Sequence, residues 1–382
     1  MTPVPSPARR RAALAAAAFL AAGALACSGG GDGGAAACPP SEIPDHGDNT
    51  LIVEGDPWSG YAPFRDPTLM DGTPYELVWV EQVCQDVRAD DLNAGRADIV
   101  VTTLDQYLLN HPEGTVVGVI DQSVGADALA LGTANHPGFD SVDDIAGLVE
   151  EFERDGRKPV LAYTGISPSE MLLNELANTT DELRLSDFEL VSTDQSATAF
   201  QMLQDDEAQL AIVWEPDTSA ARNAGYTITL SSADVPDSII DVIVAGDRLI
   251  ERDPQAVTAA LRSFYDRMDG YLEEDDQASL KALYAEDGGL EAADTESLIA
   301  GIKLYGTADA DAFMNDDLFP LDKPQVAESV DSIGSVLALV HPDLPLELAD
   351  VDGSYVHGLV GDDAGAGAPG TTGNDAGEAT DR

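Results

Sequence analysis

The chain has 382 residues and a formal net charge of −51, from 70 acidic and 19 basic residues. A surface this acidic repels phosphate backbones and anionic lipid headgroups, which excludes electrostatic binding to nucleic acid or to a bare membrane surface. The length is enough for two domains of ordinary size. Because the acids are spread along the whole chain, we interpret them as a surface adaptation, such as one to high salt.

The N-terminus predicts export. Three arginines at 9–11 precede an apolar run over 12–26, which ends at Cys27. A positive region, a short apolar run and small residues before a cleavage point are typical of a signal peptide, whereas a membrane span needs about 20 apolar residues. Residues 24–27 resemble the bacterial lipobox, in which the cysteine receives a lipid. We predict a signal peptide over 1–26 and a lipid anchor at Cys27, facing the periplasm or the exterior; secretion without lipid is the alternative.

Both ends of the exported chain are expected to be flexible. Glycine dominates the segment after Cys27, so a lipidated tether is predicted over 27–49, and an acidic, disordered tail over 358–382. Cys38 and Cys84 lie in an oxidising compartment and could pair, although Cys84 also suits a buried helix; the sequence leaves this disulfide open. The cysteines and histidines lack metal-ligand spacing, so we predict no metal site and no cofactor.

From residue 51 short apolar runs alternate with amphipathic segments, the pattern of βα units around mainly parallel sheets. A first series of strands is predicted at 51–54, 76–80, 98–101, 115–120 and 126–131. A second series is predicted at 159–163, 188–191, 210–213 and 226–230, and one further strand follows at 239–245. Beyond residue 245 the pattern indicates helices only, at 252–274, 277–285, 294–305 and 324–340.

The two series predict an α/β protein of two lobes, each a mainly parallel sheet flanked by helices. Ser141 is the expected N-cap of a helix that follows the fifth strand, which places the first crossing between lobes near 131–140 and the return near 238–245. The predicted boundaries are 50–132 with 240–357 for lobe one and 133–239 for lobe two. Two crossings imply a hinged pair with a ligand cleft at the carboxyl ends of the strands.

Five motifs at predicted strand ends occur in one order along the chain. They are Trp58-Ser59-Gly60-Tyr61-Ala62-Pro63, residues 92–99 followed by Thr102-Thr103, residues 121–127, residues 163–170 and residues 211–216. With these motifs the chain resembles, over about residues 50 to 345, the nitrate/sulfonate/taurine branch of periplasmic substrate-binding proteins. The resemblance implies a two-lobed periplasmic-binding-protein fold of type 2, capture of a small molecule by lobe closure, an ABC permease as partner and a monomer. The segment 64–73 lacks the family's usual first helix.

The sharpest local signal is a helix start at residues 167–170. Ser167 as N-cap, Pro168 at the first helical position and Glu170 at the third form a capping box. A well-made helix start is sufficient to explain the motif. The functional interpretation adds that a helix N-terminus binds anions. The predicted donors to a sulfonate, nitrate or carboxylate are the amides and hydroxyls of Thr164, Gly165, Ser167 and Ser169.

The other candidate ligand-binding residues are aromatic, hydroxyl and acidic side chains at strand ends. They are Trp58, Ser59, Tyr61, Thr102, Thr103, Asp127, Trp214, Glu215 and Asp241. An acid flanked by strand residues, as Asp241 is, is costly to bury unpaired; it pairs within the protein or meets a cationic group of the ligand. A helix N-terminus for an anionic head and an acid for a cationic tail fit a zwitterion such as taurine, whereas nitrate or a plain alkanesulfonate needs only the dipoles.

The predicted function is therefore an extracytoplasmic solute-binding lipoprotein of an ABC importer for a sulfonate-, nitrate- or taurine-like molecule. A lipoprotein that senses solute with the same cleft is one alternative. An enzyme is the other, since relatives of the implied fold take part in synthesis of the pyrimidine precursor of thiamine. We predict that the chain is not an enzyme, because it carries an export signal and offers no Gly-x-Ser-x-Gly elbow or nucleophile–base pair.

Overall fold

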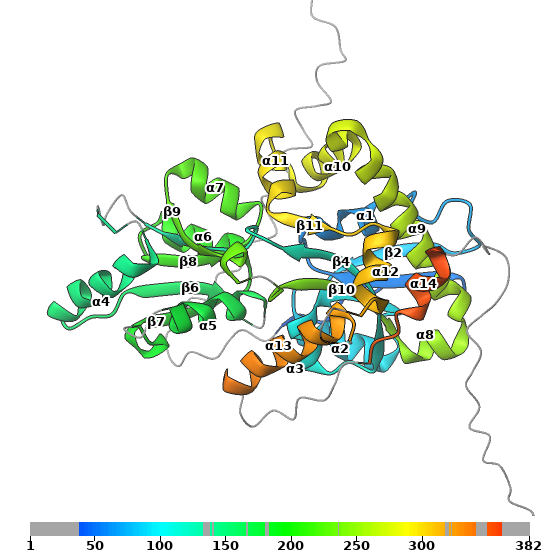
Figure 1. Ribbon diagram of the computed structural model, residues 1–382, viewed down its shortest axis with the longest axis horizontal. Coiled ribbons are helices and arrows are strands. Elements are labelled where there is room, and N and C mark those ends of the chain that lie inside the picture. Colours follow the sequence, from blue (N-terminus) through cyan, green and yellow to red (C-terminus); the bar gives the residue numbers. More distant parts are fainter. Residues whose placement is uncertain are drawn as a thin grey trace, which may run out of the picture. The chain divides into compact units, whose positions relative to one another are not determined.

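The structure, a computed structural model, describes residues 38–132, 138–139, 141–165, 167–179, 183–235, 237–317, 321, 323–340 and 350–360. The predicted signal peptide, the lipidated Cys27 and residues 361–382 of the predicted tail lie outside the described residues. Two β-sheets flanked by helices form the described part (Figure 1), which confirms the predicted α/β class. None of the described helices is long and apolar enough to cross a membrane.

The first sheet forms lobe one and has the strand order β11-β4-β10-β3-β1-β2. In that order the strands are Ile302–Leu304, Gly114–Ser123, Ile240–Gly246, Ile99–Thr103, Thr50–Gly55 and Glu76–Glu81. Every residue of β1, β3 and β10 is buried. Burial on both faces explains why these strands appear in the sequence as nearly continuous runs of valine and isoleucine.

The second sheet forms lobe two and has the order β7-β6-β8-β5-β9. In that order the strands are Glu189–Thr193, Val160–Thr164, Leu210–Val213, Ala128–Leu131 and Thr227–Ser231. The central strands β8 and β5 are buried throughout, whereas the edge strand β7 is largely exposed. The core of lobe two therefore lies on both faces of its central strands.

Strand directions show where the chain passes between lobes. In lobe one β1 to β4 run one way and β10 and β11 run the other; in lobe two only β5 is reversed. The reversed strands β5 and β10 are the first that the chain forms after each passage. Because β5 pairs with β8 and β9, the boundary predicted at residue 132 is corrected: the first crossing is 124–127. An apolar run alone does not specify which sheet it joins. The return crossing is 232–239.

The two crossing segments lie side by side and are bonded to each other. The hydroxyls of Ser123 and Ser232 are 2.7 Å apart, and the amide of Gly125 donates to the Ser232 hydroxyl, also at 2.7 Å. The carbonyl of Gly301 accepts from the amides on either side of Gly125, at 2.8 and 3.1 Å. Both connections between the lobes therefore belong to one small hydrogen-bonded unit.

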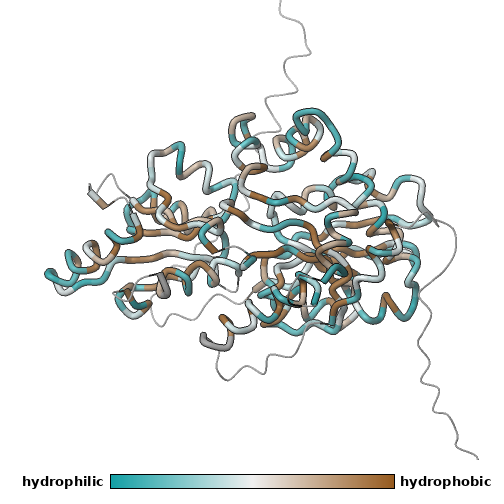
Figure 2. The backbone as a smooth tube through the Cα atoms, viewed as in Figure 1, coloured by the Kyte–Doolittle hydropathy of each residue, from teal (hydrophilic) through white to brown (hydrophobic). Residues whose placement is uncertain are grey.

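Helices flank both sheets (Figure 1), and Figure 2 shows apolar residues concentrated along the strands. In lobe one they are α1 Ala62–Arg65, α2 Gln85–Ala94, α3 Leu104–Asn110, α8 Asp247–Arg252, α9 Pro254–Glu273, α10 Ala278–Gly288, α11 Ala292–Ala300, α12 Thr307–Asn315, α13 Gln325–Val340 and α14 Ser354–Val360. In lobe two they are α4 Ile145–Arg154, α5 Ser169–Thr179, α6 Ser196–Gln204 and α7 Asp217–Ala224. The short α1 agrees with the missing first helix noted in the sequence.

Two expectations for the C-terminal part are corrected, and one is confirmed. The helix predicted over 294–305 ends at Ala300, and the next residues form β11; a strand of three residues is too short to reveal its alternation in the sequence. The helix predicted over 252–274 is α9, which begins at Pro254 because the carboxylate of Asp253 accepts from the amide of Ala256 as an N-cap. The tail predicted from residue 358 begins later, because α14 continues to Val360 and Val356 is fully buried.

The N-terminal segment is attached to lobe one. Cys38 and Cys84 form a disulfide, the pairing that the sequence left open. The side-chain amide of Gln82 donates to the carbonyl of Pro39 at 3.0 Å and to the hydroxyl of Ser41 at 3.1 Å. The flexible tether predicted over 27–49 is therefore too long at its C-terminal end, because residues from Cys38 onward are held against the loop between β2 and α2.

Candidate ligand-binding cleft

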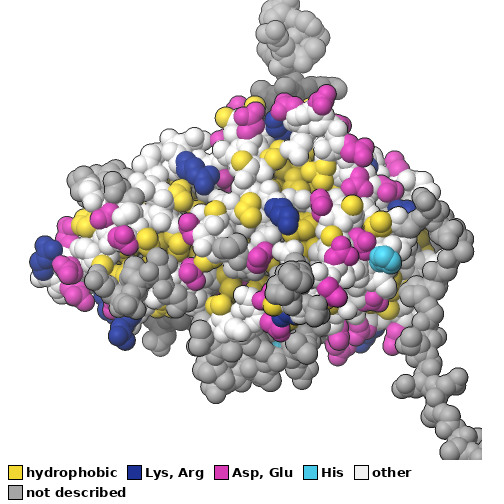
Figure 3. Space-filling model, in the orientation of Figure 1, with side chains coloured by type: hydrophobic (Ala, Val, Ile, Leu, Met, Phe, Trp, Pro, Cys, Tyr) yellow, Lys and Arg dark blue, Asp and Glu magenta, His cyan; other side chains and the backbone are white. Residues whose placement is uncertain are grey.

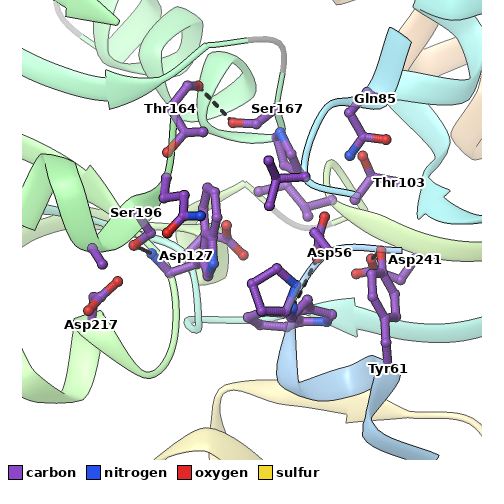
Figure 4. A pocket seen from close by; sticks show the side chains of 18 of the residues that line it. Asp56, Tyr61, Gln85, Thr103, Asp127, Thr164, Ser167, Ser196, Asp217 and Asp241 are labelled. Carbon is purple, nitrogen blue, oxygen red and sulfur yellow. Dashed lines mark hydrogen bonds between the residues drawn. The ribbon is translucent and has the colours of Figure 1, made fainter. Parts of the chain in front are cut away.

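A cavity of about 180 Å³ lies where strands from the two lobes end (Figure 4). Strands β1 and β3 lead to it in lobe one, and β6, β7 and β8 lead to it in lobe two, each followed by a helical segment. This edge is where open α/β proteins bind ligands, because the loops and helix starts after parallel strands gather there. The volume is below the roughly 300–1,000 Å³ of sites for drug-sized molecules, so the cavity suits a small ligand.

Most of the side chains that the sequence singles out line this cavity. They are Trp58, Tyr61, Thr103, Asp127, Thr164, Ser167, Trp214 and Asp241. They come from both lobes and from the first crossing, and Figure 4 shows those that it labels, among them Tyr61, Asp127 and Thr164, around one space. Position at a strand end therefore brings these residues to one cavity, and their contact with a ligand stays a prediction.

Three predicted residues have structural partners instead and do not line the cavity. Ser59 is buried in a short 3-10 helix, Ser59–Tyr61. The hydroxyl of Thr102 donates to Gln85 at 2.6 Å. The carboxylate of Glu215 accepts from the amide and the hydroxyl of Ser219, each at 3.0 Å, so it holds the first turn of α7. Consecutive residues of a strand point to opposite faces of the sheet. Only one of Thr102 and Thr103 can therefore face the cavity, and the sequence did not indicate which.

Gly165 and Ser169 also lie outside the cavity lining. The amide of Gly165 donates to the carbonyl of Thr193 at 3.2 Å, so it is not available to an anion. A Cβ at this position would overlap the side chain of Ser192, which explains the glycine. Ser169 is fully buried, and its hydroxyl has no hydrogen-bond partner among the described residues.

The start of α5 forms part of the lobe-two wall. The hydroxyl of Ser167 donates to the carbonyl of Thr164 at 2.7 Å and accepts from the amide of Ser169 at 3.2 Å, so Ser167 is the cap that the sequence predicts. Thr164 is 5% exposed, and its hydroxyl lacks a partner within the described part of the chain although it faces the cavity. A buried hydroxyl without a partner costs about 1–3 kcal/mol, and a ligand oxygen would satisfy it.

Two more helix starts complete this wall. Residues 194–197 bring the beginning of α6 to the cavity, and Pro216 and Asp217 bring the beginning of α7. Ser196 accepts from the amide of Trp214 at 3.1 Å, which ties the two loops together. Burial raises the pKa of Asp217 above its usual value, against a hydrogen bond from Ser196. Three helix N-termini therefore point positive partial charges at one cavity.

The lobe-one wall is built on one row of polar residues across three strands. Pairing of β4 with β10 places Asp121 opposite Asp241, and pairing of β10 with β3 places Asp241 opposite Thr103. We call Asp121, Asp241 and Thr103 the polar row. All three are at most 5% exposed. A bulge in β4 next to this pair changes the register, as bulges do where a side chain must be re-aimed.

The two carboxyl groups of the polar row are close enough to affect each other's ionisation, and each has one hydrogen-bond donor. The indole nitrogen of Trp58 donates to Asp121 at 3.3 Å, and the hydroxyl of Tyr61 donates to Asp241. Burial raises the pKa of Asp121 to about 7. Burial, and then the charge of Asp121, raise the pKa of Asp241 well above its usual value. The wall therefore holds two acids that resist full ionisation.

Gly60 allows this arrangement. A Cβ at Gly60 would overlap Oδ2 of Asp121 and approach the indole nitrogen of Trp58. The glycine of the Trp58-Ser59-Gly60-Tyr61 motif is therefore required by the carboxyl group of Asp121, which packs directly against the backbone of the loop.

Two further aspartates border the lobe-one wall. Asp56 forms an ion pair with the buried Arg88 at 3.0 Å and accepts from the amide of Trp58 at 2.9 Å. Asp127, in the first crossing, is 3% exposed, and burial raises its pKa to about 7. Among the described residues that line the cavity there are aspartates but no lysine, arginine, histidine or cysteine.

Sequence reasoning missed several polar residues of the cavity: Asp56, Gln85, Asp194, Gln195, Ser196 and Asp217. Asp56 and the run 194–196 directly follow strands, so the rule that found Thr103 and Thr164 could have found them. Gln85 starts α2 and reaches the cavity only through packing. Asp121 stands behind Asp241, and only the register of β4 with β10 reveals that contact.

One group of metal-capable side chains occurs among the described residues, namely Cys38, Cys84 and Asp86. Both sulfur atoms are already bonded to each other. A disulfide does not offer the thiolate that binds zinc, so this group is unsuited to a metal.

Comparison with solved structures identifies the fold. The ligand-binding component of an ABC-type import system from Staphylococcus aureus aligns with a TM-score of 0.62 at 16% identity, over 81% of this chain and 98% of the other. The periplasmic aliphatic sulphonate binding protein SsuA from Escherichia coli aligns with a TM-score of 0.58 at 17% identity, over 80% and 96%. The nitrate-binding protein NrtA from Synechocystis PCC 6803 gives 0.57 at 13%, over 81% and 91%.

This chain therefore has the two-lobed fold of periplasmic substrate-binding proteins. The desulfurization enzyme DszB has a similar structure, with a TM-score of 0.56 at 12% identity over 81% of this chain and 98% of the other, so the fold also supports catalysis. No protein-family model and no curated protein matches the sequence. The likeness thus lies in the fold, and function must be argued from the cleft.

Proposed function

We propose that the chain is the extracytoplasmic solute-binding protein of an ABC importer, and that it captures a small sulfonate-, nitrate- or taurine-like molecule by closing its two lobes. The cleft is the observation that supports this proposal. Its walls come from both lobes. In the described residues the chain passes between the lobes at two segments, and hydrogen bonds join these segments to each other. Short paired crossings act as a hinge. A ligand that contacts both walls stabilises the closed state.

The lobe-two wall is suited to the anionic group of the ligand. The starts of α5, α6 and α7 supply positive partial charges, and the hydroxyl of Thr164, which has no partner among the described residues, can donate to a ligand oxygen. An oxyanion bound at helix N-termini needs no lysine or arginine. The absence of basic side chains from the lining is therefore compatible with an anionic head, even on a molecule of net charge −51.

A thermal-shift panel tests the proposal. The purified protein is heated with taurine, ethanesulfonate, nitrate and, as a solute without charge, glucose. A ligand at 100 times its dissociation constant stabilises the folded state by about 2.7 kcal/mol, so at least one of taurine, ethanesulfonate and nitrate, each of which carries an anionic group, should raise the melting temperature while glucose should not. A folded protein that responds to none of these three solutes would contradict the proposed solute class.

We also propose that Cys27 carries a lipid that anchors the protein outside the cytoplasmic membrane, next to its permease partner, and that the protein is a monomer. Figure 3 shows acidic side chains scattered over the visible face rather than gathered in a patch, which fits a protein that does not bind the membrane through its surface. Expression in a bacterial host with labelled palmitate should label the wild type. Cys27→Ser should lose the label and leave the membrane fraction; retention of both would exclude the anchor.

A further inference from the structure

The polar row is an acidic pair without a cation. Asp121 and Asp241 are 0% and 3% exposed and face each other across β4 and β10. Two neighbouring ionised carboxylates repel each other strongly in a buried site, so at least one of them keeps a proton that the pair can share. Above about pH 7, where Asp121 is ionised and the raised pKa of Asp241 keeps its proton in place, the pair of the empty protein holds one negative charge rather than two.

No neighbouring side chain compensates the charge of the pair. The titratable and charged groups that face it from the surrounding elements are Tyr61, Asp56 with its partner Arg88, Asp127, Tyr284 of α10 and Tyr305 after β11. Arg88 is the basic member, and it is engaged by Asp56 and by the carbonyl of Val101. The described neighbours therefore offer no basic side chain that could form an ion pair with Asp121 and Asp241.

A second observation indicates that a ligand completes this wall. Thr103 lies opposite Asp241 on β3, is 3% exposed and lines the cavity; its hydroxyl lies beside Asp105 but makes no well-formed hydrogen bond with that or any other described residue. Buried polar groups are rarely left unsatisfied unless a ligand or water meets them. The aromatic rings of Trp58 and Tyr61 border the same space, and aromatic faces attract cations.

We propose that the polar row binds a protonated amine of the ligand, and that this ammonium group displaces the proton shared by Asp121 and Asp241. The inference rests on the proposed function and narrows it from any small anion to a molecule with an ammonium group as well. On binding, an N–H of the ammonium donates to Asp241, the member of the pair that lines the cavity, in place of the shared O–H. The displaced proton passes to water, and the pair changes from one negative charge to two while it gains one positive neighbour.

Two pairs of probes that differ only by an ammonium group test this inference: taurine with ethanesulfonate, and β-alanine with propionate. Each is titrated calorimetrically into the intact protein at pH 8, where Asp121 is ionised and Asp241 keeps its proton, in two buffers of different ionisation enthalpy, so that proton release is counted. The ammonium member of a pair should bind at least about ten-fold more tightly, since a hydrogen bond to a charged group contributes about 1.5–3 kcal/mol. It should also release up to one proton, and the other member none.

Asp241→Asn is the decisive variant. Its amide keeps both contacts, because the nitrogen donates to Asp121 and the oxygen accepts from Tyr61, but no proton can leave. Taurine should lose at least about ten-fold in affinity and its proton release, while ethanesulfonate should be unaffected. Thr103→Val supplies a second variant if the first does not fold, with the same selective loss. The control is Asp155→Asn, an exposed acid of lobe two outside the cavity.

The outcomes separate this inference from the proposed function. Equal affinity within both pairs, or binding of the ammonium member without proton release, would overturn the inference and leave an anion-binding protein. Failure of all four probes to bind a folded protein would overturn both. Selective loss in Asp241→Asn, with Asp155→Asn unchanged, supports the ammonium site.

Discussion

The two walls of the cleft use opposite means to prepare for charge. Lobe two offers backbone dipoles at the starts of three helices and a hydroxyl without a partner, and these favour an anion. Lobe one offers buried carboxyl groups that share a proton, and these favour a cation. The difference indicates that a protein with a net charge of −51 can build local sites of either sign, because burial and short-range dipoles decide the field within the cavity.

The largest effect is expected from Gly60→Ala. The new methyl group would overlap Asp121 and displace the polar row. Overpacking of this kind costs about 1–3 kcal/mol of folding free energy, and ammonium binding should be lost. Gly270→Ala in α9 has open space around its Cβ and should stabilise the protein by up to about 1 kcal/mol. Chemical denaturation and calorimetry measure both; a stable Gly60→Ala that binds taurine normally would contradict the described contact.

The next effect is the dependence of stability on pH. Burial raises the pKa of Asp121 and Asp127 to about 7 and that of Glu54 to about 8. The folded protein then binds more protons than the unfolded chain between about pH 4 and 8, so the free energy of unfolding should fall as pH rises through this window.

Repulsion among the many surface acids also lowers stability as pH rises. The variant Asp241→Asn distinguishes this effect from the contribution of the polar row. The amide cannot titrate, so the variant loses the proton that folded Asp241 retains and the unfolded chain releases, and the slope of melting temperature against pH should become smaller than in the wild type. An identical slope in both proteins would mean that the pair does not share a proton.

A smaller effect distinguishes unpartnered hydroxyls from paired ones. Thr164→Val removes a buried hydroxyl without a described partner, so the empty protein should gain about 1 kcal/mol while affinity for an anionic head falls several-fold. Thr102→Val is the matched control, because it leaves Gln85 without its donor and should lose about 1 kcal/mol. Denaturation curves of both variants test the contrast; destabilisation by Thr164→Val would show that its hydroxyl is satisfied in the folded protein.

The smallest effect is expected at the surface between the lobes. Asn223 of α7 donates to Asp294 of α11 at 2.9 Å, and both side chains are exposed or partly exposed. Asn223→Ala should change the free energy of unfolding by less than about 0.5 kcal/mol. Taurine affinity should change by no more than about two-fold. A larger loss of affinity would mean that this contact, rather than the two walls, holds the lobes together.

The sequence predicts the strands well because their apolar runs are long and bounded by helix starts. It predicts lobe-two residues such as Thr164 and Ser167 because a strand and a helix cap are adjacent in the chain. It does not predict the partnership of Asp121 with Asp241, which depends on a bulge in β4 and on pairing over a long separation. The assignment of β5 to lobe one was wrong for the same reason, because a single apolar run does not reveal which strands it pairs with.

The central claim is that one solute must contact both walls to close the cleft. Small-angle X-ray scattering of the intact protein at pH 6.5, with saturating taurine, ethanesulfonate or propylammonium, tests it most directly. Taurine should reduce the radius of gyration, because it carries a group for each wall, whereas the two single-charge probes should leave the radius at that of the empty protein. An equal reduction with ethanesulfonate alone, or no reduction when taurine is bound, would contradict the account.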